Sequence, residues 1–153
     1  MSKSPSPSRA DDTSQGALEQ ALRALRHRER SAAEVDRYLT ARGVDEDERN
    51  EVLRTLARTA LVDDLRFAEM RATSLVERGA GNELVRHELI RAGLDPELVD
   101  ETIASLPTET ERVARIVARR GAGPKTARYL AGKGFSEDAV RSVVADSGDE
   151  PLG

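Results

Sequence analysis

The sequence predicts an all-α protein, an elongated array of three tandem three-helix repeats, each helix-turn-helix-like, between disordered termini. Hydrophobic residues make up 38% of the chain and aromatic residues only 3%, so the core is built from Leu, Val, Ile and Ala, a composition that favours helices. Apolar residues recur with the helical period of about 3.6 residues, and helix start signals return along the chain. An internal repeat then gives the number of units.

Three leucines mark this repeat, Leu39, Leu89 and Leu130, and each stands four residues before a glycine. When the leucines are aligned, apolar residues also match fourteen residues before and fourteen residues after them; these are Leu25, Leu75, Ile116, Leu53, Ile103 and Val144. Helices this short do not persist alone, so the three helices of a unit must pack together. The expected units span residues 17 to 64, 65 to 108 and 109 to 147.

The first two units carry capping signals where their helices are expected to begin and end. In the first unit, Ser31 with Glu34 forms a capping box, and Gly43 ends the same helix. In the second unit, Gly93 ends the middle helix and Asp95-Pro96 starts the next one, with Pro at the first helical position. An apolar residue follows each glycine, which is typical of a helix C-cap with its hydrophobic contact.

The third unit begins with another capping box, formed by Thr108 and Glu111. Its glycine-rich corner, Gly121 to Ala127, resembles a helix-hairpin-helix turn, which would hold nucleic-acid phosphate on helix N-terminal N–H groups. The repeat alignment explains the same corner as the turn between two helices of the unit, with Gly134 as a C-cap. Outside the units, residues 1 to 16 and 148 to 153 offer little to bury, and we expect disordered tails there.

Composition excludes several classes of function. The 24 basic and 28 acidic residues give a net charge of -4, which argues against a protein that coats DNA indiscriminately. The chain has no Cys, and His27 and His87 have no metal-ligand spacing, so we expect no metal. Gly123 to Thr126 lacks the glycine that a phosphate-binding P-loop needs five residues earlier. We therefore expect no enzyme activity and no cofactor, and, without a long apolar run, a cytoplasmic protein.

Two stretches carry a more specific signal. They read "ALRALRHRERSAAEVDRYLTARGV" and "LVDDLRFAEMRATSLVERGAGNELVRHELIRAGL". Within them, the residues whose order and spacing are most specific are Asp64, Arg66, Phe67, Ala68, Arg78, Glu88, Leu89 and Gly93. In this order they resemble the first and second repeats of RecX, the bacterial regulator of the RecA recombinase. The resemblance covers residues 17 to 147. It implies structural roles for Asp64, Arg66, Phe67, Ala68, Glu88, Leu89 and Gly93.

The resemblance implies a non-enzymatic regulator that binds the RecA filament on single-stranded DNA. Such a protein would act as a monomer, away from membranes, and lower the ATPase, strand-exchange and co-protease activities of RecA by blocking filament growth or promoting disassembly. Direct contact with DNA is expected to be weak, because Asn82 and Glu83 stand where family members often carry basic residues. A DNA-binding module that uses helix-hairpin-helix or helix-turn-helix contacts is the alternative.

The clearest basic surface lies in the third unit, where eight basic residues outnumber five acidic ones. Arg112, Arg115 and Arg119 fall on one stripe at helical spacing, and Arg71 and Arg78 hold corresponding positions in the second unit. Such a surface suits acidic patches on a partner or phosphate. The full set predicted to bind the partner is Arg71, Arg78, Arg112, Arg115, Arg119, Arg120, Lys125, Arg128 and Lys133.

Other conspicuous side chains are expected to serve the fold. Phe67 is predicted to lie in the core, and Asp63 and Asp64 are predicted to cap a helix. Tyr38 and Tyr129 occupy the same repeat position. They suit packing between helices better than base stacking, because no second aromatic residue accompanies either of them.

Overall fold

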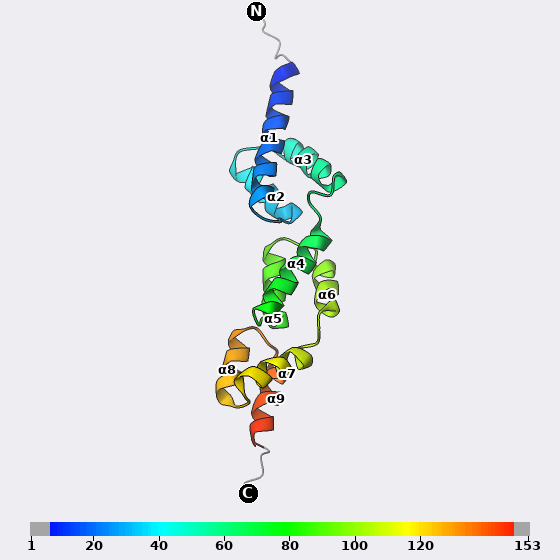
Figure 1. Cartoon of the computed structure of the whole chain (residues 1–153). Coiled ribbons are helices and arrows are strands. Elements are labelled where there is room, and N and C mark those ends of the chain that lie inside the picture. The colour runs from blue at the N-terminus through cyan, green and yellow to red at the C-terminus, as the bar shows by residue number, and fades with distance from the viewer. Residues whose placement is uncertain (1–6, 149–153) are drawn as a thin grey trace, which may run out of the picture. The chain divides into compact units, whose positions relative to one another are not determined.

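The computed structural model of the chain describes residues 7 to 148, with side-chain surroundings for residues 16 to 145. All regular structure in this part of the chain is helical, and the helices follow one another in groups of three (Figure 1). This confirms the predicted fold class of tandem three-helix repeats. By its internal contacts the chain divides into two compact units, Met1–Phe67 and Ala68–Gly153.

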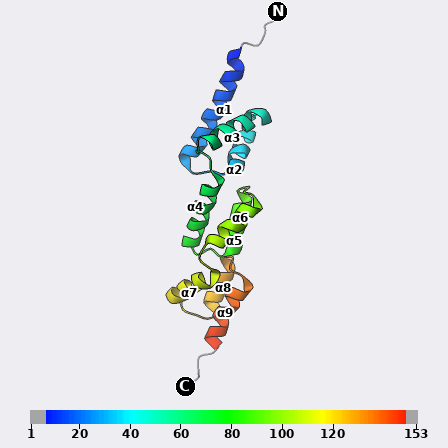
Figure 2. The ribbon, with the colours of Figure 1, turned by 90° about the vertical axis from the view of Figure 1, so that its right-hand side faces the viewer.

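The first compact unit is a three-helix bundle. Helices α1 (Pro7–His27), α2 (Ala32–Ala41) and α3 (Glu46–Arg58) all pack against one another, and both views show them side by side (Figures 1 and 2). The predicted capping box begins α2: the Glu34 N–H donates to Ser31 Oγ at 3.1 Å, and the Ser31 N–H donates to Glu34 Oε1 at 3.2 Å. The buried core consists of Ala17, Ala21, Val35, Leu39, Val52, Leu56 and Val62.

Helix α1 begins earlier than the composition suggests. Residues 7 to 16, expected in a disordered tail, are helical, whereas residues 1 to 6 of that tail lie outside the described part of the chain. Once the segment from Ala17 onward is helical and packed, each residue added in front of it extends an existing helix without a new nucleation cost. Pro7 stands in the first turn, where its missing N–H has no intrahelical partner to lose.

The second compact unit contains the remaining helices. They are α4 (Asp64–Glu77), which crosses the boundary between the compact units, α5 (Asn82–Arg91), α6 (Pro96–Ser105), α7 (Glu109–Arg120), α8 (Pro124–Gly132) and α9 (Glu137–Gly148). Helix α5 packs on α6, and α7, α8 and α9 pack against one another. The last three enclose a core of Val113, Leu130, Phe135 and Val143. The predicted C-terminal tail, apart from Gly148, lies outside the described residues.

Each repeat leucine lies in the last turn of a middle helix, and the glycine four residues later lies just beyond that helix. Gly43, Gly93 and Gly134 have φ values of 79°, 81° and 85°, a backbone conformation that glycine adopts readily. The N–H of the residue after each glycine donates to the carbonyl of the repeat leucine five residues earlier, at 3.1 to 3.3 Å. This bond is the Schellman arrangement, found at the three places where a C-cap glycine is predicted.

None of the helices in the described part of the chain combines the length and the apolar character that a membrane span requires.

Candidate partner-binding surface

The second compact unit joins two three-helix groups through the start of α5. There the Gly81 N–H donates to the Lys133 carbonyl at 2.8 Å, and the Glu83 N–H donates to the Gly134 carbonyl at 3.0 Å. A Cβ atom on Gly81 would lie 2.4 Å from the Phe135 nitrogen, so only glycine allows this approach of backbone to backbone. The corner after α8 is thereby fixed against the start of α5.

A single carboxylate strengthens the same junction. Glu109, the first residue of α7, accepts the Asn82 N–H on Oε1 at 2.9 Å and the Ser136 N–H on Oε2 at 3.1 Å. Asn82 begins α5 and Ser136 immediately precedes α9, so one negative charge satisfies the N-termini of two helices. A carboxylate is favoured there because free N–H groups and the helix dipole both attract it.

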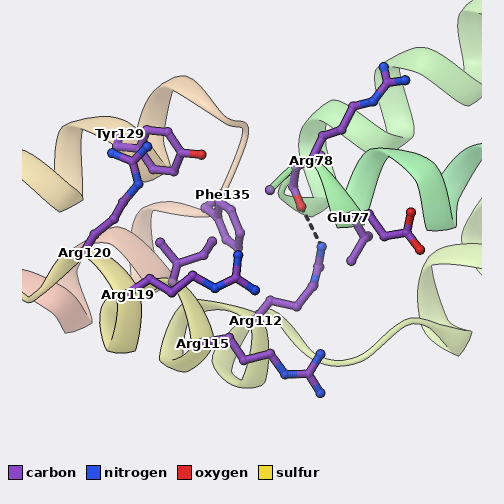
Figure 3. A pocket seen from close by; sticks show the side chains of 12 residues that line it. Glu77, Arg78, Arg112, Arg115, Arg119, Arg120, Tyr129 and Phe135 are labelled. Carbon is purple, nitrogen blue, oxygen red and sulfur yellow. Dashed lines mark hydrogen bonds between the residues drawn. The ribbon is translucent and has the colours of Figure 1, made fainter.

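Arg112, one of the residues predicted to bind the partner, completes the junction. Only 4% of this residue is exposed. Its guanidinium donates to the Ala80 carbonyl at 2.8 Å, the bond drawn in Figure 3. It also donates to the Pro107 carbonyl at 3.1 Å and to Asn82 Oδ1. Burial lowers the pKa of Arg112 while nearby Glu109 opposes that shift. Helical spacing could not reveal this role, because the accepting carbonyls of Ala80 and Pro107 lie in loops outside α7.

A pocket of about 500 Å³ opens beside this junction. Figure 3 shows Arg119 reaching from α7 towards Phe135, Arg120 lying against Tyr129, and Arg78 and Arg115 at the edges. We call this the arginine pocket; its lining residues are Val76, Glu77, Arg78, Gly79, Ala80, Arg112, Arg115, Ile116, Arg119, Arg120, Tyr129 and Phe135.

The charges of the arginine pocket differ in how far they are already engaged. The Arg120 guanidinium lies 3.5 Å from the centre of the Tyr129 ring, a cation–π contact. Arg78, Arg115 and Arg119 are exposed, and their guanidinium groups have no ion pair or hydrogen bond with any residue that the structure describes. These three side chains are therefore free to meet an anion.

The other predicted partner-binding residues lie elsewhere or are engaged. Arg71 forms an ion pair with Glu88 at 3.3 Å. Lys133 is half-buried, and its Nζ donates to the Arg78 carbonyl at 3.3 Å. Lys125 and Arg128 are exposed on α8 but do not line the arginine pocket. The structure thus brings four of the nine predicted residues together around the opening and places Arg112 in its buried wall.

The motif residues at the start of α4 make structural contacts within the first compact unit. Asp64 Oδ1 accepts the N–H of Ala32, the first residue of α2, at 2.8 Å. Arg66 forms two hydrogen bonds with the Glu29 carboxylate, at 3.1 and 3.2 Å. Asp63, and not Asp64, caps α4 by accepting the Arg66 N–H at 3.1 Å.

The remaining motif residues are distributed between the core and helix α5. Phe67, Ala68 and Leu89 are buried. Glu88 pairs with Arg71, and Gly93 follows the C-cap residue of α5, Ala92, with a positive φ. None of these residues lines the arginine pocket.

Sequence reasoning missed the apolar part of the arginine pocket. Val76, Ile116 and Phe135 come from three separate segments, and each fits a helix-packing pattern taken alone. Tyr129 was expected to pack between helices, but its pairing with Arg120 also positions a charge at the opening. A spacing of nine residues between Arg120 and Tyr129 gives no local signal for such a contact.

Tandem three-helix units define a class of protein, the helical-repeat proteins, which bind partners along their surfaces. Residues 17–56 match the first three-helix domain of RecX, and residues 63–103 match the second. The chain is 34% identical to the regulatory protein RecX of Halorhodospira halophila, over 94% of this chain and 96% of that protein. It is 32% identical to the RecX of Stenotrophomonas maltophilia strain R551-3, over 87% and 88% of the two chains.

Solved structures agree on the fold. The crystal structure of RecX from Lactobacillus salivarius superposes with a TM-score of 0.73 at 21% identity, over 89% of this chain and 97% of that one. The chain belongs to the RecX family of regulatory proteins, which confirms the family resemblance seen in the sequence.

Proposed function

We propose that this protein binds the RecA filament on single-stranded DNA and lowers RecA activity by blocking filament extension or promoting disassembly. Membership of a family of regulatory proteins supports a role in regulation. One observation connects the proposal to a particular surface. The guanidinium groups of Arg78, Arg115 and Arg119 lie around one pocket and have no ion pair among the described residues. Exposed arginines with no internal partner favour contact with an acidic surface.

The glycine-rich corner favours this function over the alternative of a DNA-binding hairpin. Thr126 is buried, and its hydroxyl donates to the Gly121 carbonyl at 2.7 Å inside the corner. Pro124 occupies the first position of α8 and has no N–H to offer a phosphate. The corner therefore lacks part of the donor set on which a helix N-terminus relies to bind anions.

The proposal is tested by adding substoichiometric protein to RecA on single-stranded DNA and measuring ATP hydrolysis. The wild-type chain should lower the rate. The double variant Arg115→Ala/Arg119→Ala should need about tenfold more protein for the same inhibition, since each of two solvent-exposed ion pairs contributes about 0.7 kcal/mol. Lys125→Ala/Arg128→Ala is the matched control, because it removes the same charge from exposed positions outside the arginine pocket.

Binding to DNA without RecA distinguishes the two functions. A DNA-binding module should bind naked single-stranded DNA with a steep dependence on salt. A filament regulator should show little affinity for the same DNA under the conditions in which it inhibits RecA. Inhibition that the Arg115→Ala/Arg119→Ala variant retains in full would remove the arginine pocket from the proposal.

A further inference from the structure

We infer that the arginine pocket accepts an acidic segment of a protein partner, in which one apolar side chain is flanked by carboxylates. The inference deepens the proposed function, on which the identity of the partner rests, by naming the chemistry that the partner presents. Two features of the pocket lead to it. Its edge carries arginines that have no ion pair among the described residues, and its lining includes the half-buried Val76 and Ile116 and the buried Phe135.

The edge of the arginine pocket selects negative charge. Arg78, Arg115 and Arg119 are exposed and lack an acidic partner among the described residues. A guanidinium group offers a planar pair of donors that matches a carboxylate in two parallel hydrogen bonds. All three cations are arginine, the basic residue that is enriched in protein interfaces, whereas lysine is depleted there.

The interior of the arginine pocket selects an apolar group. Val76 from α4, Ile116 from α7 and Phe135 from the corner before α9 all contribute to the lining. An apolar centre surrounded by polar residues is the usual arrangement of an interface region that dominates binding energy. A volume of about 500 Å³ is within the range of pockets that enclose a compact ligand group. One aliphatic or aromatic side chain of a partner fits this description.

Two observations favour a protein segment over single-stranded nucleic acid. The Arg120 guanidinium covers the Tyr129 ring at 3.5 Å, so the ring is not free to serve as a stacking platform for a base. Lys125 and Arg128 do not line the pocket, so no row of cations continues along it.

The inference is tested without RecA, by fluorescence polarisation with labelled peptides and the full-length chain. The probe is the peptide Gly-Ser-Glu-Asp-X-Asp-Glu-Ser-Gly, with X as Leu, Ile, Val, Met, Phe or Ser. At least one apolar X should bind saturably and about fivefold or more tightly than Ser, because the apolar lining discriminates against a hydroxyl. A set in which no apolar peptide binds, or in which Ser binds as well, would overturn the inference.

Variants then locate the binding. Arg115→Ala/Arg119→Ala should weaken the apolar peptides about tenfold or more, whereas the control Lys125→Ala/Arg128→Ala should leave their affinity within about twofold. Val76→Thr keeps the shape of the side chain but not its apolar character, and it should narrow the gap between the apolar peptides and Ser. Circular dichroism before each titration excludes unfolded variants. Equal affinities of the wild-type chain and the three variants for the apolar peptides would overturn the inference.

A competing oligonucleotide separates the two kinds of macromolecule. Twenty-nucleotide oligo(dT) should not displace the bound peptide at equal concentration, and displacement would assign the pocket to nucleic acid instead. The RecA ATPase assay keeps the two proposals distinct. Peptide binding without inhibition of RecA would overturn the proposed function alone, whereas inhibition of RecA by a chain that binds none of the peptides would overturn this inference alone.

Discussion

The starts of α4 and α7 make the same kind of hydrogen bond to the start of a preceding middle helix. At each start, a carboxylate on the first residue of the helix accepts the N–H of the first residue of a preceding middle helix. Asp64 accepts from Ala32 at 2.8 Å, and Glu109 accepts from Asn82 at 2.9 Å. The third middle helix, α8, begins with Pro124, which has no N–H to donate, so this bond has no counterpart there.

The two helix starts differ in what the following arginine does. Arg66 pairs with the carboxylate of Glu29, and the two side chains are 41% and 33% exposed. The bonds of Arg66 to the carbonyls of Ala60 and Leu61 are exposed as well. Arg112 is buried and donates mainly to backbone carbonyls. A solvent-exposed ion pair contributes little, because water competes for both charges, whereas a buried carbonyl that loses its donor is left unsatisfied. The start of α7 should therefore depend far more on its arginine than the start of α4.

The largest expected effect comes from closing the space at Gly81. The variant Gly81→Ala should destabilise the second compact unit by about 3 kcal/mol, because its Cβ would meet the Phe135 nitrogen. Gly81 has an ordinary φ of -86°, so this cost is purely steric. Gly43→Ala is the matched control, since its Cβ would meet open space while its positive φ costs about 1 kcal/mol.

Native-state hydrogen exchange measures this difference locally. The Glu83 amide, which donates to the Gly134 carbonyl, should lose protection in Gly81→Ala and keep it in Gly43→Ala. Equal protection in both variants would show that the corner after α8 can move aside at little cost.

The next effect compares the two arginines directly. Arg112→Ala should lower the free energy of unfolding by about 2 to 3 kcal/mol, because the buried Ala80 carbonyl loses its donor and the contacts to Pro107 and Asn82 are lost with it. Arg66→Ala should cost about 1 kcal/mol or less, as expected for a partly exposed pair. Urea unfolding followed by circular dichroism measures both values. A cost for Arg66→Ala as large as that for Arg112→Ala would contradict the distinction between the two helix starts.

The carboxylates provide a smaller test of the same comparison. Glu109→Gln should destabilise the chain by about 1 kcal/mol, since one charge serves two helix N-termini. Asp64→Asn should cost about half as much, because Asp64 accepts from one helix only. Thermal unfolding of the two variants, each measured against the wild-type chain, gives the ratio. A larger loss in Asp64→Asn would reverse the order.

Local features of this fold could be predicted from the sequence, because their contacts lie within a few residues. The capping box of Ser31 with Glu34 and the C-cap after Leu39 each depend on neighbours in one helix. Arg112 and Arg115 show the limit. They are three residues apart on the same helix, yet one is buried and the other is exposed. The difference depends on the Ala80 carbonyl, thirty-two residues away, which no helical period can reveal.

The smallest effect concerns charge in the capping box of α2, where the balance of forces is opposite to that at Arg112. Burial alone would raise the pKa of Glu34, but hydrogen bonds from Arg28 and Ser31 hold it below its ordinary value. At Arg112 burial prevails and lowers the pKa. Because the folded pKa of Glu34 lies below the unfolded one, its ionised form adds stability above the ordinary carboxyl pKa, and that stability is lost as pH falls through the lowered value.

The variant Glu34→Gln isolates this charge, since Gln can still close a capping box. The wild-type chain should exceed it in stability by roughly 0.5 kcal/mol at pH 7, because the Arg28 partner is half exposed and solvent screens the pair. The gap should shrink as the pH is lowered from 5 towards 3. Urea unfolding at pH 7, 5 and 3 measures it. A gap that stays constant over this range would mean that shape, and not charge, accounts for the contribution of Glu34, and the contrast with Arg112 would then rest on burial alone.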